Sequence, residues 1–439
     1  MNFILQSIEK ECEDMYVNPN GALPSDVVKG LYEAKGMEAL GTSQFILDNS
    51  INRYAQQMAV RCFRCIVLHK WKLMEDANAI ASIQSYLFGL LITKGGREMA
   101  STVALLLLKR WAYMLDKVPK ENGSMFMKAY VDEIRARPTH LSTLLSMMDV
   151  FKSSTSWSRE ASLFLTMRQY GSVYGEFVLD ILPDIAEIAY ANLSQYPSIC
   201  VSLLIAVFGF TDKEEEEDDQ FMAKPSMVSP KYDAIIDAPE LYTGLMAMYA
   251  EDGGNADVVS LLHHIVSRLT TSESDRKTRL LHCANELLCN QGALGKQDVH
   301  HAVCLLMSKI MTAGVFAFDE MKKEFVAALA GFTVSSFHAH AWAPHSLHYL
   351  IQIWGNRQRN WQKRVKPYAG EILTAYLQAR LGTAGDEGGA VHKQFGAETD
   401  AVYYLMATDH KVLFPVVMAA FDAAATETQV VWMLAIVSS

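Results

Sequence analysis

Three amphipathic helical segments follow one another between Ser43 and Lys117, and they limit what this chain can fold into more than any other feature. In the first segment, Val60, Phe63 and Val67 make the second side of the helix apolar, so it is expected to have neighbours on two sides. Its main apolar face follows the i, i+3, i+4, i+7 spacing of a helix and consists of Ala55, Met58, Ala59, Cys62, Cys65 and Ile66.

The second segment, 79–93, has one apolar stripe, whereas the third, from Val103 to Leu108, is apolar nearly all round. The stripe is formed by Ile80, Ile83, Leu87, Leu90 and Leu91, and the more polar Ser82, Ser85 and Gly89 lie elsewhere. A helix covered by neighbours, then one half exposed, then one covered again is the pattern that stacked helix pairs require.

The spacing of two tryptophans supports stacked pairs. Trp71 and Trp111 each follow a basic residue near the end of an expected helix, and they lie 40 residues apart. A repeat of about 40–47 residues built from two helices is typical of HEAT and armadillo proteins. Because helical patterns continue along all 439 residues, the sequence predicts an all-α fold. We expect an α-α superhelix, a HEAT/armadillo-type solenoid of about ten helix pairs.

The charge of the chain limits its possible partners, and its cysteines indicate the redox state of its compartment. The net charge of −10 disfavours direct nucleic-acid binding and fits a basic protein partner. The seven cysteines lie mostly in apolar helical context, which predicts buried free thiols in a reducing compartment. No signal peptide is visible, and no run of about 18 uncharged apolar residues predicts a membrane span.

An acidic run is the sharpest change of composition in the chain. It lies within residues 211–236, which are predicted to form a long solvated loop between helices. Such a loop is either a disordered insertion or an acidic arm that touches a basic partner. Its carboxylates belong to Glu214, Glu215, Glu216, Glu217, Asp218 and Asp219.

The last helix predicted by the sequence runs from Val430 to Val437 and is apolar without a polar cap. A solenoid is expected to end on a polar capping repeat. We therefore expect a chain truncated at its C-terminus, or a terminus covered by something else.

Few residue clusters have the spacing of a chemical site. Cys62 and Cys65, with His69, share one helix face at metal-ligand spacing, but a structural zinc site needs about four ligands, so core packing is expected. A second group surrounds a break between helices, where ordinary loop histidines are expected and a metal or proton-relay role is the alternative: His338, His340, His345 and His348. No phosphate-binding loop or nucleophile elbow occurs, so the chain is expected to be no enzyme and to bind no cofactor.

The one basic-aromatic patch lies between Arg357 and Arg364 and includes Trp361. We expect a solvated loop between repeats at this place. The alternative is a surface that contacts phosphates or an acidic partner.

At the N-terminus, the segment Gln44–Ser50 is followed by Tyr54–Ala59 and by Ile66–Trp71 at a helix end. These segments resemble the importin-β/exportin family of nuclear transport receptors. Further segments resemble the exportin-four group, with the exportin-seven group as the alternative: Pro239–Tyr242, Leu347–Trp354, Tyr376–Leu381 and Val431–Ile436. The resemblance leaves 151–175, the acidic loop and 253–275 unmatched.

The resemblance implies a karyopherin that shuttles between nucleus and cytoplasm. It would bind Ran-GTP through residues 1–138, with further repeats over 139–439, and would carry a protein cargo past the FG-repeat proteins of the nuclear pore. The exportin-four group would imply the hypusine-bearing translation factor as cargo. By the same analogy the residues facing Ran are Asp48, Asn49, Ser82, Ser85, Lys128 and Asp132. The alternative function is a HEAT-repeat scaffold that does not bind Ran.

Overall fold

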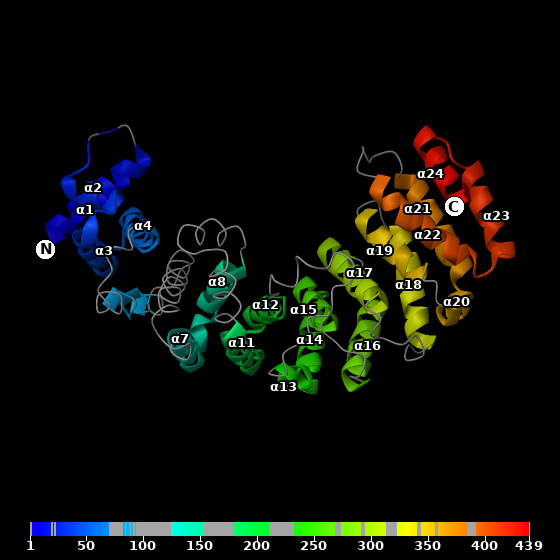
Figure 1. Ribbon diagram of the computed structural model, residues 1–439, viewed down its shortest axis with the longest axis horizontal. Coiled ribbons are helices and arrows are strands. Elements are labelled where there is room, and N and C mark those ends of the chain that lie inside the picture. Colours follow the sequence, from blue (N-terminus) through cyan, green and yellow to red (C-terminus); the bar gives the residue numbers. More distant parts are fainter. Residues whose placement is uncertain are drawn as a thin grey trace. The chain divides into compact units, whose positions relative to one another are not determined.

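The computed structural model describes most of the chain: residues 2–18, 21, 23–69, 82, 83, 85–87, 89, 90, 93, 124–152, 179–209, 232–267, 274–290, 295–312, 323–339, 344–355, 359–383 and 392–438. Within these ranges every regular element is a helix and none is a strand (Figure 1). The predicted all-α fold is confirmed. Trp71 and Trp111, from which the repeat length was predicted, lie outside the described residues.

The contacts divide the chain into two compact units. One comprises residues 1–192 and 198–218, and the other comprises 193–197 and 219–439. The division predicted at residue 138 concerns Ran binding and stays a prediction. The described helices as far as residue 208 are α1 (Asn2–Val17), α2 (Asp26–Tyr32), α3 (Gly36–Asn49), α4 (Arg53–His69), α7 (Ser124–Ala136), η3 (Pro138–His140), α8 (Leu141–Lys152), α11 (Leu179–Ala191) and α12 (Pro197–Phe208).

The helix α4 is the packing centre at the N-terminal end, because it contacts α1, α2 and α3. Its fully covered residues are Ala55, Met58, Ala59, Cys62, Phe63 and Ile66. On the predicted second apolar side, Phe63 is buried, whereas Val60 is only partly buried and the side chain of Val67 lies outside the described residues, so the prediction of neighbours on two sides is met at Phe63. In the next helical segment, Ile83, Leu87 and Leu90 are buried while Ser82, Ser85 and Gly89 are exposed, as the single apolar stripe predicts.

The second unit contains the remaining helices. These are α13 (Asp233–Ile236), α14 (Pro239–Glu251), α15 (Ala256–Val266), α16 (Ser274–Cys289), α17 (Gln297–Thr312), α18 (Lys323–Ala339), α19 (Pro344–Trp354), α20 (Arg359–Val365), α21 (Ala369–Thr383), α22 (His392–Met406), α23 (His410–Asp422) and α24 (Glu427–Ser438).

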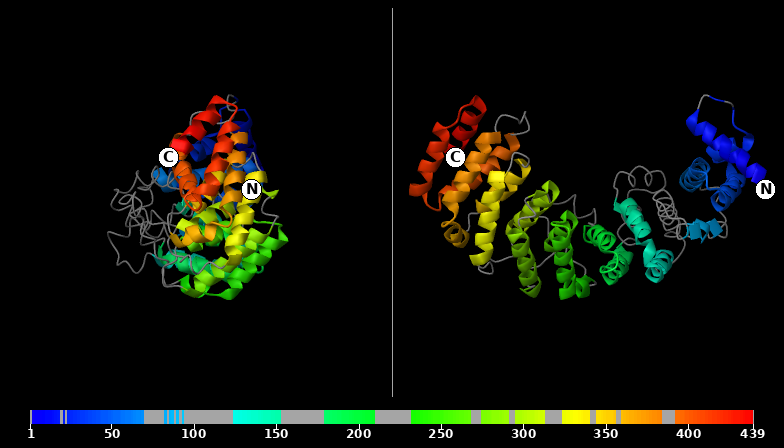
Figure 2. Two further views of the ribbon diagram at one scale, coloured as in Figure 1. Left: turned by 90° about the vertical axis from the view of Figure 1, so that its right-hand side faces the viewer. Right: turned by 180° about the vertical axis from the view of Figure 1, so that it is seen from behind.

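Two layers of helices make up this unit, and each helix contacts the next one in its own layer. One layer runs α14, α16, α18, α21, α23, and the other runs α15, α17, α19, α22, α24 (Figure 2). The first helices of successive pairs begin 35, 49, 46 and 41 residues apart. These intervals scatter around the predicted repeat of about 40–47 residues, as expected for stacked two-helix repeats.

Capping side chains and prolines in the sequence set several helix starts. Ser25 caps α2, since its side-chain oxygen accepts a hydrogen bond from the Val28 amide. Pro197 and Pro239 each occupy the first position of a helix. Proline favours the first turn of a helix, so the sequence would predict a helix start at Pro415, but α23 begins at His410 and Pro415 lies inside it on an exposed side.

The loop predicted around Arg357–Arg364 was also wrong, because residues from Arg359 form the short helix α20. The indole of Trp361 is fully buried, and its Nε1 donates a hydrogen bond to the Ile353 carbonyl at 3.0 Å. It stacks on Trp354 with ring centroids 5.6 Å apart. Burial of one aromatic side chain therefore holds this basic segment against the end of α19.

The predicted loop at 211–236 ends earlier than expected, because residues 233–236 form α13. Tyr232 and Ile236 are buried, and the guanidinium of Arg276 on α16 binds two carboxylates beside them. Its Nη2 lies 2.9 Å from Asp233 Oδ1 and 2.7 Å from Asp237 Oδ2. The acidic residues 214–219 lie outside the described residues.

Replacement of Trp361 by alanine is expected to destabilise the second unit by about 3–5 kcal/mol, because a large aromatic side chain is removed from a filled core. The measurement is the urea midpoint of unfolding with its slope. Lys363→Ala, an exposed change on the same helix, is the control and should have an effect below about 0.5 kcal/mol. Equal midpoints for the two variants would contradict the buried position of Trp361.

The ion pairs of Arg276 with Asp233 and Asp237 predict that the free energy of unfolding depends on pH. Hydrogen bonding from Arg276 lowers the pKa of Asp237 below its ordinary value of 3.8. The folded state thus binds a proton less readily than the unfolded chain, so this carboxylate stabilises the fold at neutral pH. That stabilisation is lost as the pH falls from about 4 through the folded pKa.

Asp237→Asn should therefore lower the urea midpoint at pH 7, by about 1 kcal/mol or less because Asp237 is half exposed. The difference from the wild type should shrink at pH 3. The exposed Asp400→Asn on α22 is the control and should show no such convergence. A difference that is as large at pH 3 as at pH 7 would contradict stabilisation by the ion pair between Asp237 and Arg276.

Candidate partner-binding surface

Tyr86 joins two of the elements on which the predicted Ran contacts lie. Its hydroxyl lies 2.8 Å from Asp48 Oδ1 and 3.1 Å from the Gln44 carbonyl oxygen, both on α3. Its ring packs on Phe63 of α4 with centroids 5.9 Å apart. Partial burial, together with the hydrogen bond to Asp48, raises the pKa of Tyr86 above its ordinary value. The phenol is a hydrogen-bond donor at neutral pH, and it holds the exposed Asp48 carboxylate in place.

The other predicted residues near Tyr86 have exposed side chains. Asn49 donates a hydrogen bond from Nδ2 to the Phe45 carbonyl at 2.9 Å and remains open to solvent. Ser82 and Ser85 are exposed on the helix that carries Tyr86. Asp48 and the helix of the two serines are thus brought together, and their polar groups are available to a partner.

Lys128 and Asp132 lie one helical turn apart on α7, and both are exposed. Asp132 is already engaged, because Arg135 Nη1 lies 2.7 Å from its Oδ1. Arg135 also reaches Glu187 of α11 at 3.0 Å, so this network ties α7 to α11. Lys128 has no ion-pair partner among the described residues and is the freer of the two charges.

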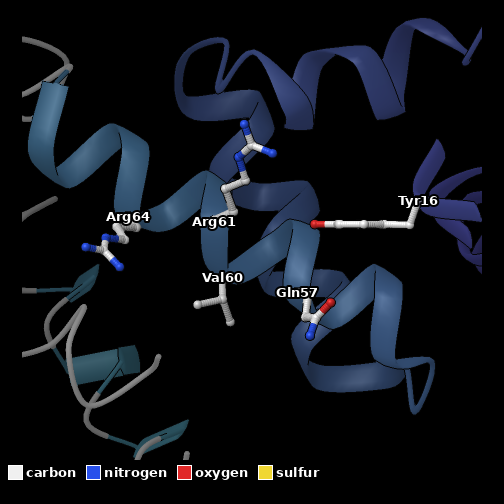
Figure 3. Close-up of a pocket in the computed structure, with 5 residues that line it drawn as sticks. All are labelled: Tyr16, Gln57, Val60, Arg61 and Arg64. Atoms are coloured by element: carbon white, nitrogen blue, oxygen red, sulfur yellow. The ribbon is translucent and has the colours of Figure 1, made fainter. Parts of the chain in front are cut away.

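A basic pocket on α4 was missed by the sequence analysis. It has a volume of about 320 Å³ and is lined by Tyr16, Gln57, Val60, Arg61 and Arg64 (Figure 3). Gln57, Arg61 and Arg64 follow helical spacing, which could have pointed to a polar face of α4. The part supplied by Tyr16 of α1 could not be seen in any window of sequence.

The candidate metal ligands do not assemble in the part of the chain that the structure describes, where no three His, Cys, Asp or Glu side chains gather as a metal site. Cys62 is buried, with its Sγ 3.8 Å from the Ala39 carbonyl, whereas Cys65 is partly exposed. His338 is exposed. The side chains that lie outside the described residues are those of His69, His340, His345 and His348.

None of the described helices is both long enough and apolar enough to cross a membrane.

No family model matches the sequence. The chain is 21% identical to Exportin-7-A of Xenopus laevis over 416 residues, which cover 86% of this chain and 38% of the relative. Exportin-7-B of the same organism matches with the same identity and coverage. Ran-binding protein 16 of Drosophila melanogaster is 27% identical over 114 residues, 24% of this chain and 10% of that protein.

An engineered protein of solved structure aligns with 94% of this chain, with 12% identity and a TM-score of 0.21. The chain spans 38% of the length of the exportin-7 relatives. The similarity to these relatives supports an exportin/importin-β-like family and does not single out the exportin-four group.

Proposed function

We propose that this chain is part of a nuclear export receptor, which binds Ran-GTP and a protein cargo and shuttles with them between nucleus and cytoplasm. The observation that carries the proposal is the similarity to exportin-7 proteins over 86% of the chain. A stack of helix pairs suits this role, because it offers long surfaces on which two partners can bind. The chain would act by binding and catalyse no reaction.

The Ran surface proposed here includes Asp48, Asn49, Ser82 and Ser85, together with Lys128 on α7. All five side chains are exposed, and Tyr86 fixes Asp48 before a partner arrives. A group that is already ordered loses less conformational entropy on binding. Asp132 would contribute by orienting Arg135, with which it forms an ion pair at 2.7 Å.

The narrower relationship that we propose is to the exportin-seven group, because the similar exportins carry that name. The exportin-four group, with the hypusine-bearing translation factor as cargo, is the alternative. The net charge of −10 favours a basic cargo in either case. FG-repeat proteins of the nuclear pore are proposed as further partners.

A helical scaffold without Ran binding is the second candidate function, and the two-layered helix stack fits it equally well. A titration of the whole chain with Ran loaded with a non-hydrolysable GTP analogue separates the two, with GDP-loaded Ran as the control. The receptor proposal predicts tighter binding of the GTP form. Equal affinity for both forms, or no binding of either, would leave the scaffold.

Lys128→Glu is expected to slow association with Ran-GTP by about two- to fivefold, since charges at the rim of an interface act mainly on the association rate. The dissociation rate should change less, and the difference should fade at high salt. Lys411→Glu, the same change at an exposed position of α23, is the matched control. Stopped-flow association that is slowed equally by both variants would show a net-charge effect and contradict a contact at Lys128.

A further inference from the structure

The exposed side of α4 is basic in an otherwise acidic protein. The helix contains Arg53, Arg61 and Arg64 and no aspartate or glutamate, whereas the whole chain has a net charge of −10. The apolar face of α4 is used for packing on α1, α2 and α3. Arg53 and Arg61 are exposed and Arg64 is partly buried, and Arg61 and Arg64 line a pocket.

The pocket combines donors with a small apolar surface. Figure 3 shows Gln57, Val60, Arg61 and Arg64 projecting from α4, with the hydroxyl end of Tyr16 directed toward that helix. The guanidinium and amide groups, with the phenol, all offer N–H or O–H donors. Val60 supplies the apolar contact. Such a lining matches an oxyanion attached to a short aliphatic stem.

The position of Arg61 is set by an aromatic ring. Its guanidinium carbon lies 4.6 Å from the centroid of the Tyr32 ring on α2. Stacking on a ring face orients the planar group and leaves the N–H donors at its edge for other partners. Among the described residues no carboxylate lies within ion-pair distance of Arg61.

The acidic side chains of α1 do not fill this pocket. Glu9 accepts a hydrogen bond from the Ser50 hydroxyl at 2.6 Å, and Glu11 accepts one from the Ser25 amide at 2.8 Å. Both carboxylates are thus engaged in holding neighbouring segments. Glu13 and Asp14 are exposed and are not among the residues that line the pocket.

We propose that this pocket binds the carboxylates of an acidic peptide segment in a partner protein. Arginine pairs with carboxylate through parallel hydrogen bonds. A volume of about 320 Å³ lies at the lower end of the range for small-molecule sites, and it suits one or two acidic side chains. A nucleic acid needs a long basic track, which an acidic chain with one short basic face does not provide. The proposal goes beyond Ran binding and does not depend on it.

The test is fluorescence anisotropy of the whole chain with a fluorescein-labelled hexaglutamate peptide at low salt. Labelled hexalysine and unlabelled inorganic phosphate are the comparison probes. Saturable binding of hexaglutamate is expected, and phosphate should displace it only weakly. No binding of hexaglutamate, or complete displacement by a few millimolar phosphate, would overturn a peptide site.

Three variants locate the binding. Arg61→Gln combined with Arg64→Gln should weaken hexaglutamate binding about fivefold, as expected for partly exposed charge pairs. Gln57→Glu keeps both arginines and adds a repelling charge, so it should also weaken binding. Arg53→Gln, on the same helix but outside the pocket, is the matched control.

Circular dichroism of each variant checks that the helices are intact. If Arg53→Gln weakens binding as much as the double variant does, the attraction is a general charge effect and the pocket proposal fails. It also fails if Gln57→Glu leaves the affinity unchanged in a folded protein.

Discussion

Burial of apolar helix faces between helices of the same layer is the interaction on which the rest of this structure depends. Leu262 of α15, Val303 of α17 and Leu350 of α19 are all fully buried along one layer. A helix of 11–16 residues, as these are, is marginal when isolated in water. Each helix is therefore stable because its neighbours cover it, and each repeat depends on the repeat before it and the repeat after it.

Polar groups inside the stack fix how its helices meet. The carboxylate of Glu398 on α22 accepts a hydrogen bond from the Tyr376 hydroxyl and faces the Arg380 guanidinium at 3.3 Å, all three buried. A buried ion pair adds little net stability, but breaking it leaves an uncompensated charge, so it penalises other registers of α21 against α22. Close packing also fixes how two helices meet at Gly355, because a β-carbon there would overlap the backbone of Ala401.

Sequence periodicity predicted those features that lie within one helix. It identified the main covered face of α4 and the single stripe at Ile83, Leu87 and Leu90. Sequence periodicity failed where contacts between residues far apart in the chain determine the structure. The helix α20 has too few residues to show a helical period in the sequence. It is stabilised because Trp361 stacks on Trp354. The pocket on α4 needs Tyr16 of α1, which lies some forty residues away in the chain.

Native-state hydrogen exchange of the Val303→Ala variant tests most directly whether neighbouring repeats hold each other. The change removes buried methyl groups from the centre of α17. Faster amide exchange is expected in α17 and in its layer neighbours α15 and α19, because each repeat in a stack is stabilised by its contacts with the adjacent repeats. Exchange in α1–α4 should be unchanged. Equal acceleration over the whole chain, or acceleration confined to α17, would contradict stabilisation by neighbouring repeats.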